Sequence, residues 1–157
     1  MIKINVVAVG KVKENYFLDG IKEYAKRLTK YCDFTMTEIQ EENYLKVDDG
    51  LIKVIKEKEG ERILSHLKGY VIAMAIEGKK TTSENFAKTI RRLADTCGGI
   101  ITFVIGGSYG LSDAVKGRAN ELMSFSDMTF PHTLFRLMLT EQLYRAFSIN
   151  AGSAYHK

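Results

Sequence analysis

Three apolar runs in the sequence are each short and closely followed by glycine. They cover residues 2–9, 70–76 and 100–105, and the first is interrupted only by Lys3 and Asn5. Runs of this length without an alternating polar face are typical of strands buried on both sides, as in parallel sheets. A chain with several such strands must cover both faces of its sheet, which favours the α/β fold class.

Segments with helical periodicity lie between these runs. From Glu14 onward, apolar residues recur at spacings of three and four, as in Phe17, Ile21 and Leu28, with charged residues on the opposite face. Similar patterns predict helices in residues 41–68, 81–97, 111–122 and 131–149, and further strands in residues 34–39 and 123–130. We expect one domain over residues 1–157, with a mostly parallel sheet of five to six strands and helices on both faces.

Local signals predict how three of these helices are built. Thr81 and Glu84 have the spacing of a capping box, with Ser83 as a competing cap. Pro131 is expected to open the last helix, where a missing N–H costs nothing. Residues 41–68 are interpreted as one helix, bent near Gly60, whose lysines and glutamates face solvent.

The composition excludes several classes of protein. The chain is 45% apolar and 27% charged, as globular proteins are. No apolar run reaches the roughly 18 residues needed to cross a membrane, and the first ten residues do not resemble a signal peptide. Cys32 and Cys97 lack the spacing of a metal or redox motif, so we expect no metal. These features indicate a cytoplasmic protein, and the net charge of +4 favours an anionic partner while also fitting many basic enzymes.

Two segments near the C-terminal half have the character of ligand-binding loops. F-V-I-G-G-S-Y-G, residues 103–110, places glycines at the end of a buried strand, where main chain can approach a ligand. This favours a ligand-binding loop, with a plain strand-to-helix turn as the alternative. Its spacing matches neither the dinucleotide fingerprint nor a Walker A loop. S-F-S-D-M-T-F-P-H, residues 124–132, mixes polar and apolar groups as an amphipathic ligand would require, or forms a capped helix entrance with His132 near its start.

The predicted last helix, residues 131–149, has scarcely any polar face. A helix that is apolar all round must be covered all round, so one side should meet the sheet and the other a second copy of the chain. Arg136 and Arg145 are polar exceptions. Each could pair with Glu141 or face an anionic substrate, and the spacing leaves both interpretations open.

These motifs together resemble the RlmH family. The resemblance rests on the two loop segments, on E-Q-L-Y-R-A, on the terminal Y-H-K and on the opening V-A-V-G-K, and it covers the whole chain. Members are small SPOUT-class methyltransferases that act on a pseudouridine of large-subunit ribosomal RNA. The resemblance implies an obligate homodimer and a C-terminal trefoil knot that holds S-adenosylmethionine, a chain path that physical rules alone would not predict.

Carried over by motif, the resemblance also implies the cofactor-binding residues. They are Met74, Gly106, Phe125, Ser126, Asp127, Met128, Thr129 and Phe130. The expected reaction is methyl transfer to N3 of a pseudouridine, on the assembled ribosome.

The expected catalytic residues are Tyr155, His156 and Arg145. We hypothesise that the tail crosses to the partner's cofactor, with His156 as the candidate base by its intrinsic pKa, and that Arg145 and Lys157 meet phosphate. Many members have proline where this chain has Ala154, which leaves the tail less constrained. The alternatives are another nucleotide-binding α/β enzyme and a non-catalytic dimer that binds ribosomes.

Overall fold

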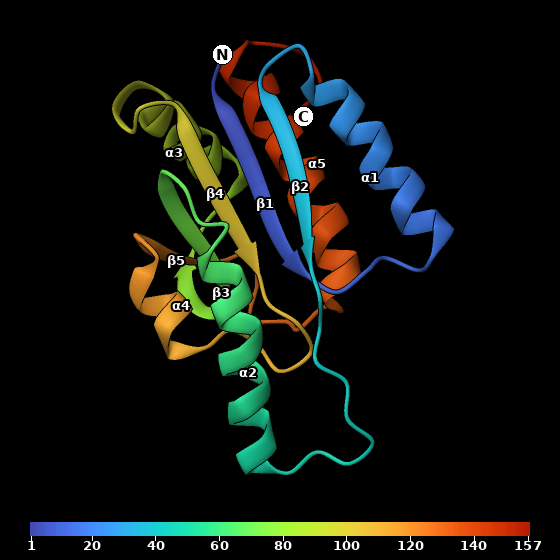
Figure 1. The fold of residues 1–157 in the computed structure, drawn as a ribbon. Helices are drawn as coiled ribbons and strands as arrows, with labels where there is room; N and C mark the ends of the chain where they lie inside the picture. The colour runs from blue at the N-terminus through green and yellow to red at the C-terminus, as the bar shows by residue number, and fades with distance from the viewer.

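The computed structural model describes all 157 residues, in which five strands and five helices alternate (Figure 1). In chain order they are β1 (Lys3–Val9), α1 (Asn15–Leu28), β2 (Asp33–Ile39), α2 (Asp49–Leu64), β3 (Tyr70–Lys80), α3 (Ser83–Thr96), β4 (Ile100–Ile105), α4 (Asp113–Arg118), β5 (Glu121–Ser124) and α5 (His132–Asn150). The predicted single α/β architecture is confirmed, with five strands at the lower end of the expected range. None of the helices is long and apolar enough to cross a membrane.

The five strands form one sheet in the order β2-β1-β4-β3-β5, and every neighbouring pair is parallel. The three apolar runs of the sequence are therefore the three inner strands, β1, β4 and β3. Parallel alignment brings the carboxyl ends of all strands to one edge of the sheet (Figure 1). Open α/β sheets bind their ligands at this edge.

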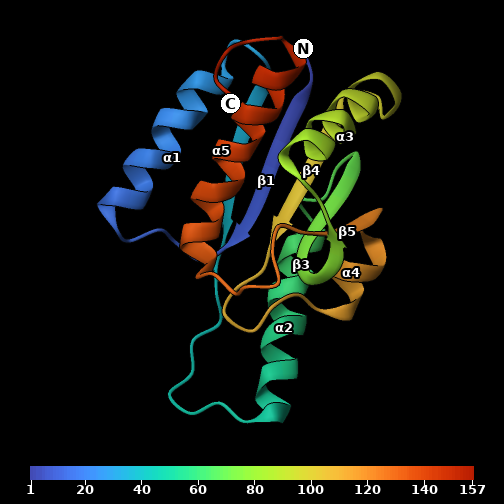
Figure 2. The same cartoon turned by 180° about the vertical axis from the view of Figure 1, so that it is seen from behind.

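Helices cover both faces of the sheet. On one face α5 lies across the centre, with α1 on one side and α3 on the other (Figure 2). The core of this face includes Ile4, Phe103, Phe86 and Leu139, all fully or almost fully buried. On the opposite face α2 and α4 cover Val7, Val104 and their neighbours.

The strands around β5 differ from their predicted bounds. Residues 123–130 are not one strand, because β5 ends at Ser124 and the following residues leave the sheet. By contrast β3 continues to Lys80, four residues beyond its predicted end, with a register shift between Met74 and Lys79. Gly78 allows this path, since a Cβ there would lie 2.5 Å from the backbone nitrogen of Met123.

The helix starts are also displaced from the predicted positions. Thr82, rather than Thr81 or Ser83, caps α3 by accepting a hydrogen bond from the N–H of Asn85 at 3.1 Å. Asp48 caps α2 in the same way, so the segment before it is a loop and the helix is shorter than predicted. Pro131 precedes the first residue of α5 instead of occupying it.

The connection between β5 and α5 is the feature that positions the site. β5 lies at one border of the sheet, whereas α5 packs against β1 and β4. Residues 125–131 therefore cross the carboxyl ends of the inner strands before the helix begins. The trefoil knot implied by the resemblance stays a prediction.

Candidate functional site

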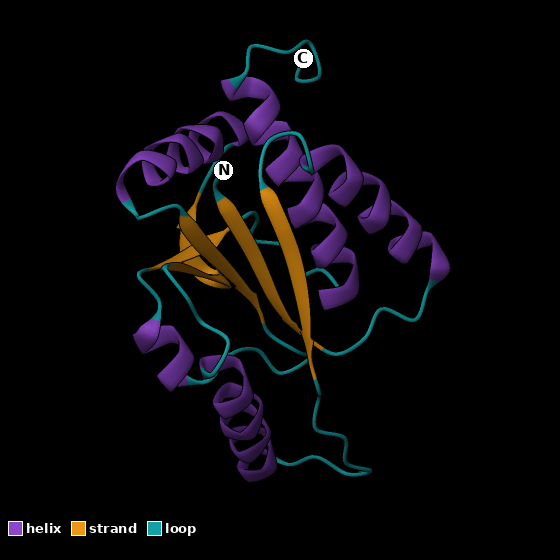
Figure 3. Ribbon diagram, turned by 45° about the horizontal axis from the view of Figure 1, so that its top comes forward, coloured by secondary structure: helices purple, strands orange, loops and turns teal.

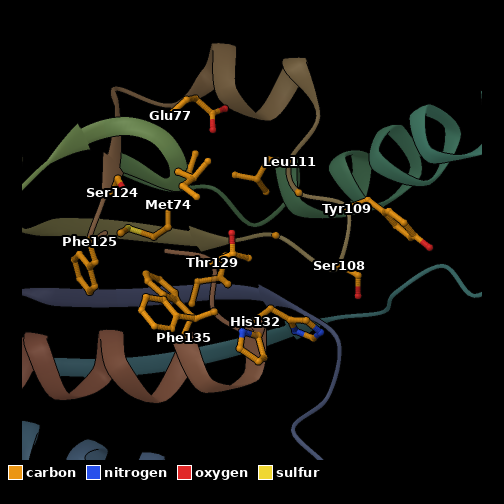
Figure 4. A pocket seen from close by; sticks show the side chains of 18 of the residues that line it. Met74, Glu77, Ser108, Tyr109, Leu111, Ser124, Phe125, Thr129, His132 and Phe135 are labelled. Atoms are coloured by element: carbon orange, nitrogen blue, oxygen red, sulfur yellow. The ribbon is translucent and has the colours of Figure 1, made fainter. Parts of the chain in front are cut away.

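A cleft of about 890 Å³ opens at the carboxyl edge of the sheet (Figure 4). Its walls come from the end of β3, the glycine loop after β4, the segment after β5 and the first turn of α5. Phe125 lies toward one end of the cleft, and Ser108 and His132 lie toward the other. The volume and the mainly apolar lining are those of a pocket for a small organic ligand.

The glycine loop forms one wall because its backbone is unusually close-packed. Gly107 and Gly110 are bridged, and the N–H of Gly110 donates to the carbonyl of Gly107 at 3.1 Å. A Cβ on Gly106 would lie 2.9 Å from the carbonyl carbon of Gly110, which itself has a φ of +87°. These positions favour glycine for steric reasons, and they leave main chain bordering the cleft.

The segment after β5 forms a second wall. The hydroxyl of Ser126 accepts from the N–H of Met128 at 3.0 Å, and the hydroxyl of Ser124 donates to the carbonyl of Ser126 at 2.9 Å. Phe125 packs between Phe86 and Phe135, with ring centroids 5.6 and 5.2 Å away. The short turn is therefore fixed by its own hydrogen bonds and by an aromatic cluster.

The structure brings seven of the eight predicted cofactor residues to the cleft. These are Met74, Gly106, Phe125, Ser126, Met128, Thr129 and Phe130. Asp127 does not line the cleft: its side chain is mostly exposed and pairs with Lys80. The turn made by Ser126 accounts for this placement, because it directs consecutive side chains to different sides.

His132 lines the cleft, although its sequence position indicated only a helix entrance. Its Nδ1 is buried without a hydrogen-bond partner. Burial lowers the pKa of His132, the Arg136 cation lowers it further, and Glu41 and Glu14 act in the opposite direction. The imidazole is therefore mostly neutral near pH 7.

Arg136 holds the first turn of α5 against the sheet. It is fully buried, its Nη1 donates to Glu38 at 2.7 Å, and its Nη2 donates to the carbonyls of Gly10 and Val9 at 3.0 and 3.3 Å. Burial lowers the pKa of Arg136, and the ion pair with Glu38 opposes this shift. Arg136 therefore neither pairs with Glu141 nor faces a substrate.

Other residues of the cleft were not among the predicted cofactor-binding residues, although Ile105 lies within the predicted loop segment 103–110. Ile105 and Leu111 flank the glycine loop, and Phe135 follows His132 on α5. At the rim, Lys116 pairs with Glu77 at 2.5 Å. The rule that ligands bind at the carboxyl ends of parallel strands would have found Ile105 and Leu111.

The C-terminal tail, residues 152–157, is folded back rather than frayed (Figure 3). Gly152 has a φ of +70°, and the N–H of Ser153 donates to the carbonyl of Ser148 at 3.0 Å, which forms a Schellman end to α5. The hydroxyl of Tyr155 lies 2.9 Å from Glu141 and 3.3 Å from the hydroxyl of Tyr24. The tail is thus anchored without a proline at Ala154.

Arg145 and His156 belong to the same network as Tyr155. Arg145 pairs with Glu141 at 2.5 Å, as one of the two interpretations of its spacing predicted. Burial, followed by the hydrogen bonds to Tyr24 and Glu141, raises the pKa of Tyr155. None of the tail residues lines the cleft of its own chain.

A second cleft, of about 440 Å³, runs along the outer side of α5 between α1 and α3. Its apolar lining includes Leu134, Leu137 and Met138, which are only partly buried. The predicted two-sided character of this helix is visible here, because the sheet covers one side and leaves these residues as an apolar groove.

Comparison with known proteins places this geometry in a family. The family model described as "Predicted SPOUT methyltransferase" matches residues 2–156. The chain belongs to the SPOUT methyltransferase family. Relatives named "Ribosomal RNA large subunit methyltransferase H" include one from Latilactobacillus sakei, 51% identical over 159 residues, and one from Bacillus pumilus, 53% identical over 161 residues. Each alignment covers 99% of this chain and 100% of the relative.

Solved structures of other proteins share the fold at low sequence identity. A probable methyltransferase from Bordetella pertussis has a TM-score of 0.58 and 11% identity, covering 92% of this chain and 95% of its own. A probable methylase family protein from Haemophilus influenzae has a TM-score of 0.55 and 11% identity, covering 98% of this chain and 70% of its own. These similarities support the overall fold of this SPOUT chain.

Proposed function

We propose that this chain is an S-adenosylmethionine-dependent methyltransferase that methylates N3 of a pseudouridine in large-subunit ribosomal RNA. The observation that carries the proposal is the full-length similarity, at about half of all positions, to proteins named ribosomal RNA large subunit methyltransferase H. The cleft supports it, because both walls implied by the resemblance, Gly106 and residues 125–130, lie at one edge of the sheet.

The cleft residues fit the proposed cofactor. An apolar slot for a purine is formed by Met74, Phe125 and Phe135. The close-packed glycine loop offers main-chain groups that can form hydrogen bonds with the edge of the purine. When bound, S-adenosylmethionine supplies an electrophilic methyl group on a sulfonium, so the transfer needs no metal. The protein would contribute mainly proximity and alignment between the two reactants.

We propose that two copies form the enzyme. The apolar groove around Leu137 is the surface expected to bury itself against the partner's α5, and burial of exposed apolar surface favours association. Within one chain the tail lies on the outer side of α5 and away from the cleft. The partner's cleft is therefore the site that Tyr155, His156 and Arg145 are proposed to complete.

A role is proposed for three tail residues and for Arg145 on α5, and the chemistry of each supports it. His156 would accept the imide proton of the substrate, and Tyr155 would orient the base. Arg145 and the exposed Lys157 would contact phosphate. A positioned base typically contributes about 10²- to 10⁴-fold to such a step.

The proposed substrate is the assembled ribosome, which places the reaction in the cytoplasm. The net charge of +4 is modest for binding through phosphate contacts alone, so a preshaped ribosomal surface would have to supply much of the recognition. Equal rates on ribosomes and on naked RNA fragments would refute this part of the proposal.

Mapping of the product tests the proposal directly. Ribosomes incubated with the protein and labelled S-adenosylmethionine should yield one new 3-methylpseudouridine by nucleoside mass spectrometry. Calorimetry should show binding of S-adenosylmethionine and not of NAD. Cofactor binding without methyl transfer to any ribosomal substrate would favour a non-catalytic ribosome-binding dimer instead.

A further inference from the structure

The imidazole of His156 is held from both sides in the tail network. Its Nε2 lies 2.9 Å from Oε1 of Glu84 on the first turn of α3, and its Nδ1 lies 3.0 Å from Nη1 of Arg145. A guanidinium has donors only, so Nδ1 must be the acceptor in this pair. The ring proton therefore resides on Nε2, where it is donated to the carboxylate of Glu84.

We propose that Glu84 is a positioning residue for the reaction, which fixes the tautomer of His156 so that Nδ1 is its proton-accepting atom. A carboxylate that orients a histidine in this way is a recurring device in catalytic and metal sites. The inference rests on the proposed function, because it assumes that His156 acts on the substrate.

Arg145 covers the accepting atom in the free protein. Its Nε and Nη2 both donate to Oε1 of Glu141, at 3.0 and 2.5 Å, which leaves Nη1 as the group that contacts His156. Hydrogen bonds from guanidinium to a charged oxygen are stronger than those to a neutral nitrogen. An RNA phosphate would therefore draw Nη1 away from His156 and uncover Nδ1 when the substrate arrives.

The substrate proton would move from N3 of the pseudouridine to Nδ1 of His156. The N3–H bond of the pseudouridine breaks, its electron pair stays on N3 as the nucleophile, and the proton forms a new bond to Nδ1. The resulting imidazolium carries one positive charge, opposite the single negative charge of Glu84. N3 uses its electron pair to bond the methyl carbon, and the electrons of the broken carbon–sulfur bond go to sulfur.

Glu84 is suited to this role by its own environment. Hydrogen bonding to His156 is the largest cause that lowers the pKa of Glu84, so the carboxylate stays ionised at neutral pH. Its side chain is 60% exposed and that of His156 is 26% exposed, so the pair is accessible in the free chain. The helix is capped by Thr82, whose hydroxyl accepts from the N–H of Asn85, and this cap does not involve the Glu84 side chain.

The test compares Glu84→Ala and Glu84→Gln with the matched control Glu23→Gln, which alters a surface carboxylate paired with Arg27 at 3.4 Å on α1. We expect Glu84→Ala to lower kcat on ribosomes by about 10- to 100-fold with little change in KM, as loss of an orienting partner does. The kcat of Glu84→Gln should fall less, because the amide oxygen of glutamine can still accept a hydrogen bond from the Nε2–H of His156. Glu23→Gln should match the unsubstituted protein.

Nitrogen-15 NMR of the His156 ring provides a readout that is independent of turnover. In the unsubstituted protein the proton should reside on Nε2, and Glu84→Ala should give a mixture of tautomers. A proton on Nδ1 in the unsubstituted protein, or full kcat in Glu84→Ala, would overturn the inference. If deletion of residues 155–157 abolishes methylation while Glu84→Ala is silent, only this inference fails; if the deletion is silent too, the proposed role of the tail fails with it.

Discussion

Replacement of Arg136 by methionine should destabilise the protein strongly, because Arg136 satisfies three acceptors from a fully buried position. Methionine fills much of the same volume, so the cost comes from the lost hydrogen bonds rather than from a cavity. The carbonyls of Val9 and Gly10 would lose a buried donor, at about 1–3 kcal/mol for each group left unsatisfied. Glu38 is 43% exposed and can be rehydrated, so its share is small. Together the two carbonyls account for a loss of about 2–6 kcal/mol.

Urea denaturation at fixed protein concentration measures this loss. In a thermal scan of a chain of this size, each kcal/mol lost corresponds to a fall in Tm of roughly 2–4 °C. The control is Lys58→Met, which removes a surface partner of Glu42 at 3.7 Å and should change stability by no more than about 0.5 kcal/mol. A loss below about 1 kcal/mol for Arg136→Met would show that water replaces the guanidinium. The hydrogen bonds of Arg136 would then not be what holds α5 against β1.

Three further substitutions test the cleft, a buried acid and the groove. Gly106→Ala should weaken binding of S-adenosylhomocysteine about tenfold or more by calorimetry, because its Cβ would lie 2.9 Å from the backbone of Gly110; unchanged affinity would contradict the role of this loop. Burial is the main cause that raises the pKa of Glu59, whose Oε1 has no partner, so its ionisation destabilises the fold as pH rises. Glu59→Gln should therefore stabilise at pH 8 and progressively less toward pH 4 in urea titrations, and a gain that grows at low pH would reverse this sign. Leu137→Glu should convert the proposed dimer to a monomer in light scattering, and a persistent dimer would place the interface elsewhere.

Much of the fold can be predicted from local patterns of apolar and polar residues. Residues 2–9, 70–76 and 100–105 are apolar on both faces because they are the three inner strands, and a parallel sheet leaves them no solvent side. The prediction extends the outer strand β5 too far, to residue 130, because the residues after Ser124 also include apolar side chains. Its continuation, residues 125–130, contains apolar side chains that face a cleft instead of a neighbouring strand, and composition does not distinguish these two environments.

Site residues could be predicted where a sequence motif includes them. They could not be predicted where contacts between distant parts of the chain determine the position of the side chain. The loop residues Phe125 and Thr129 could be identified by resemblance, and both line the cleft. Arg136 could not be assigned, because its partner Glu38 lies 98 residues away and no helical spacing indicates it. Asp127 shares a motif with its neighbours, but one local turn directs it to Lys80.

Helix α5 connects the cleft to the tail network. The proposed exchange of tails between partners can therefore be tested by complementation. Its first turn contributes His132 to the cleft, while Arg145 near its other end belongs to the tail network, about 20 Å farther along the axis. A protomer with Gly106→Ala keeps its tail, and a protomer lacking residues 155–157 keeps its cleft. At S-adenosylmethionine concentrations well below the weakened affinity of Gly106→Ala, neither should methylate ribosomes appreciably by itself.

Mixing these two variants in equal amounts, with subunit exchange, should restore activity. Random pairing makes about half of the dimers mixed, and each mixed dimer has one intact cleft completed by one intact tail, so about a quarter of full activity is expected. A control mixture of Gly106→Ala with unsubstituted protein calibrates the exchange. If the two inactive variants stay inactive together after exchange has been verified, each tail must serve the cleft of its own chain. The tail would then have to leave Glu141 and Glu84 to reach it, because no tail residue lines that cleft in the structure.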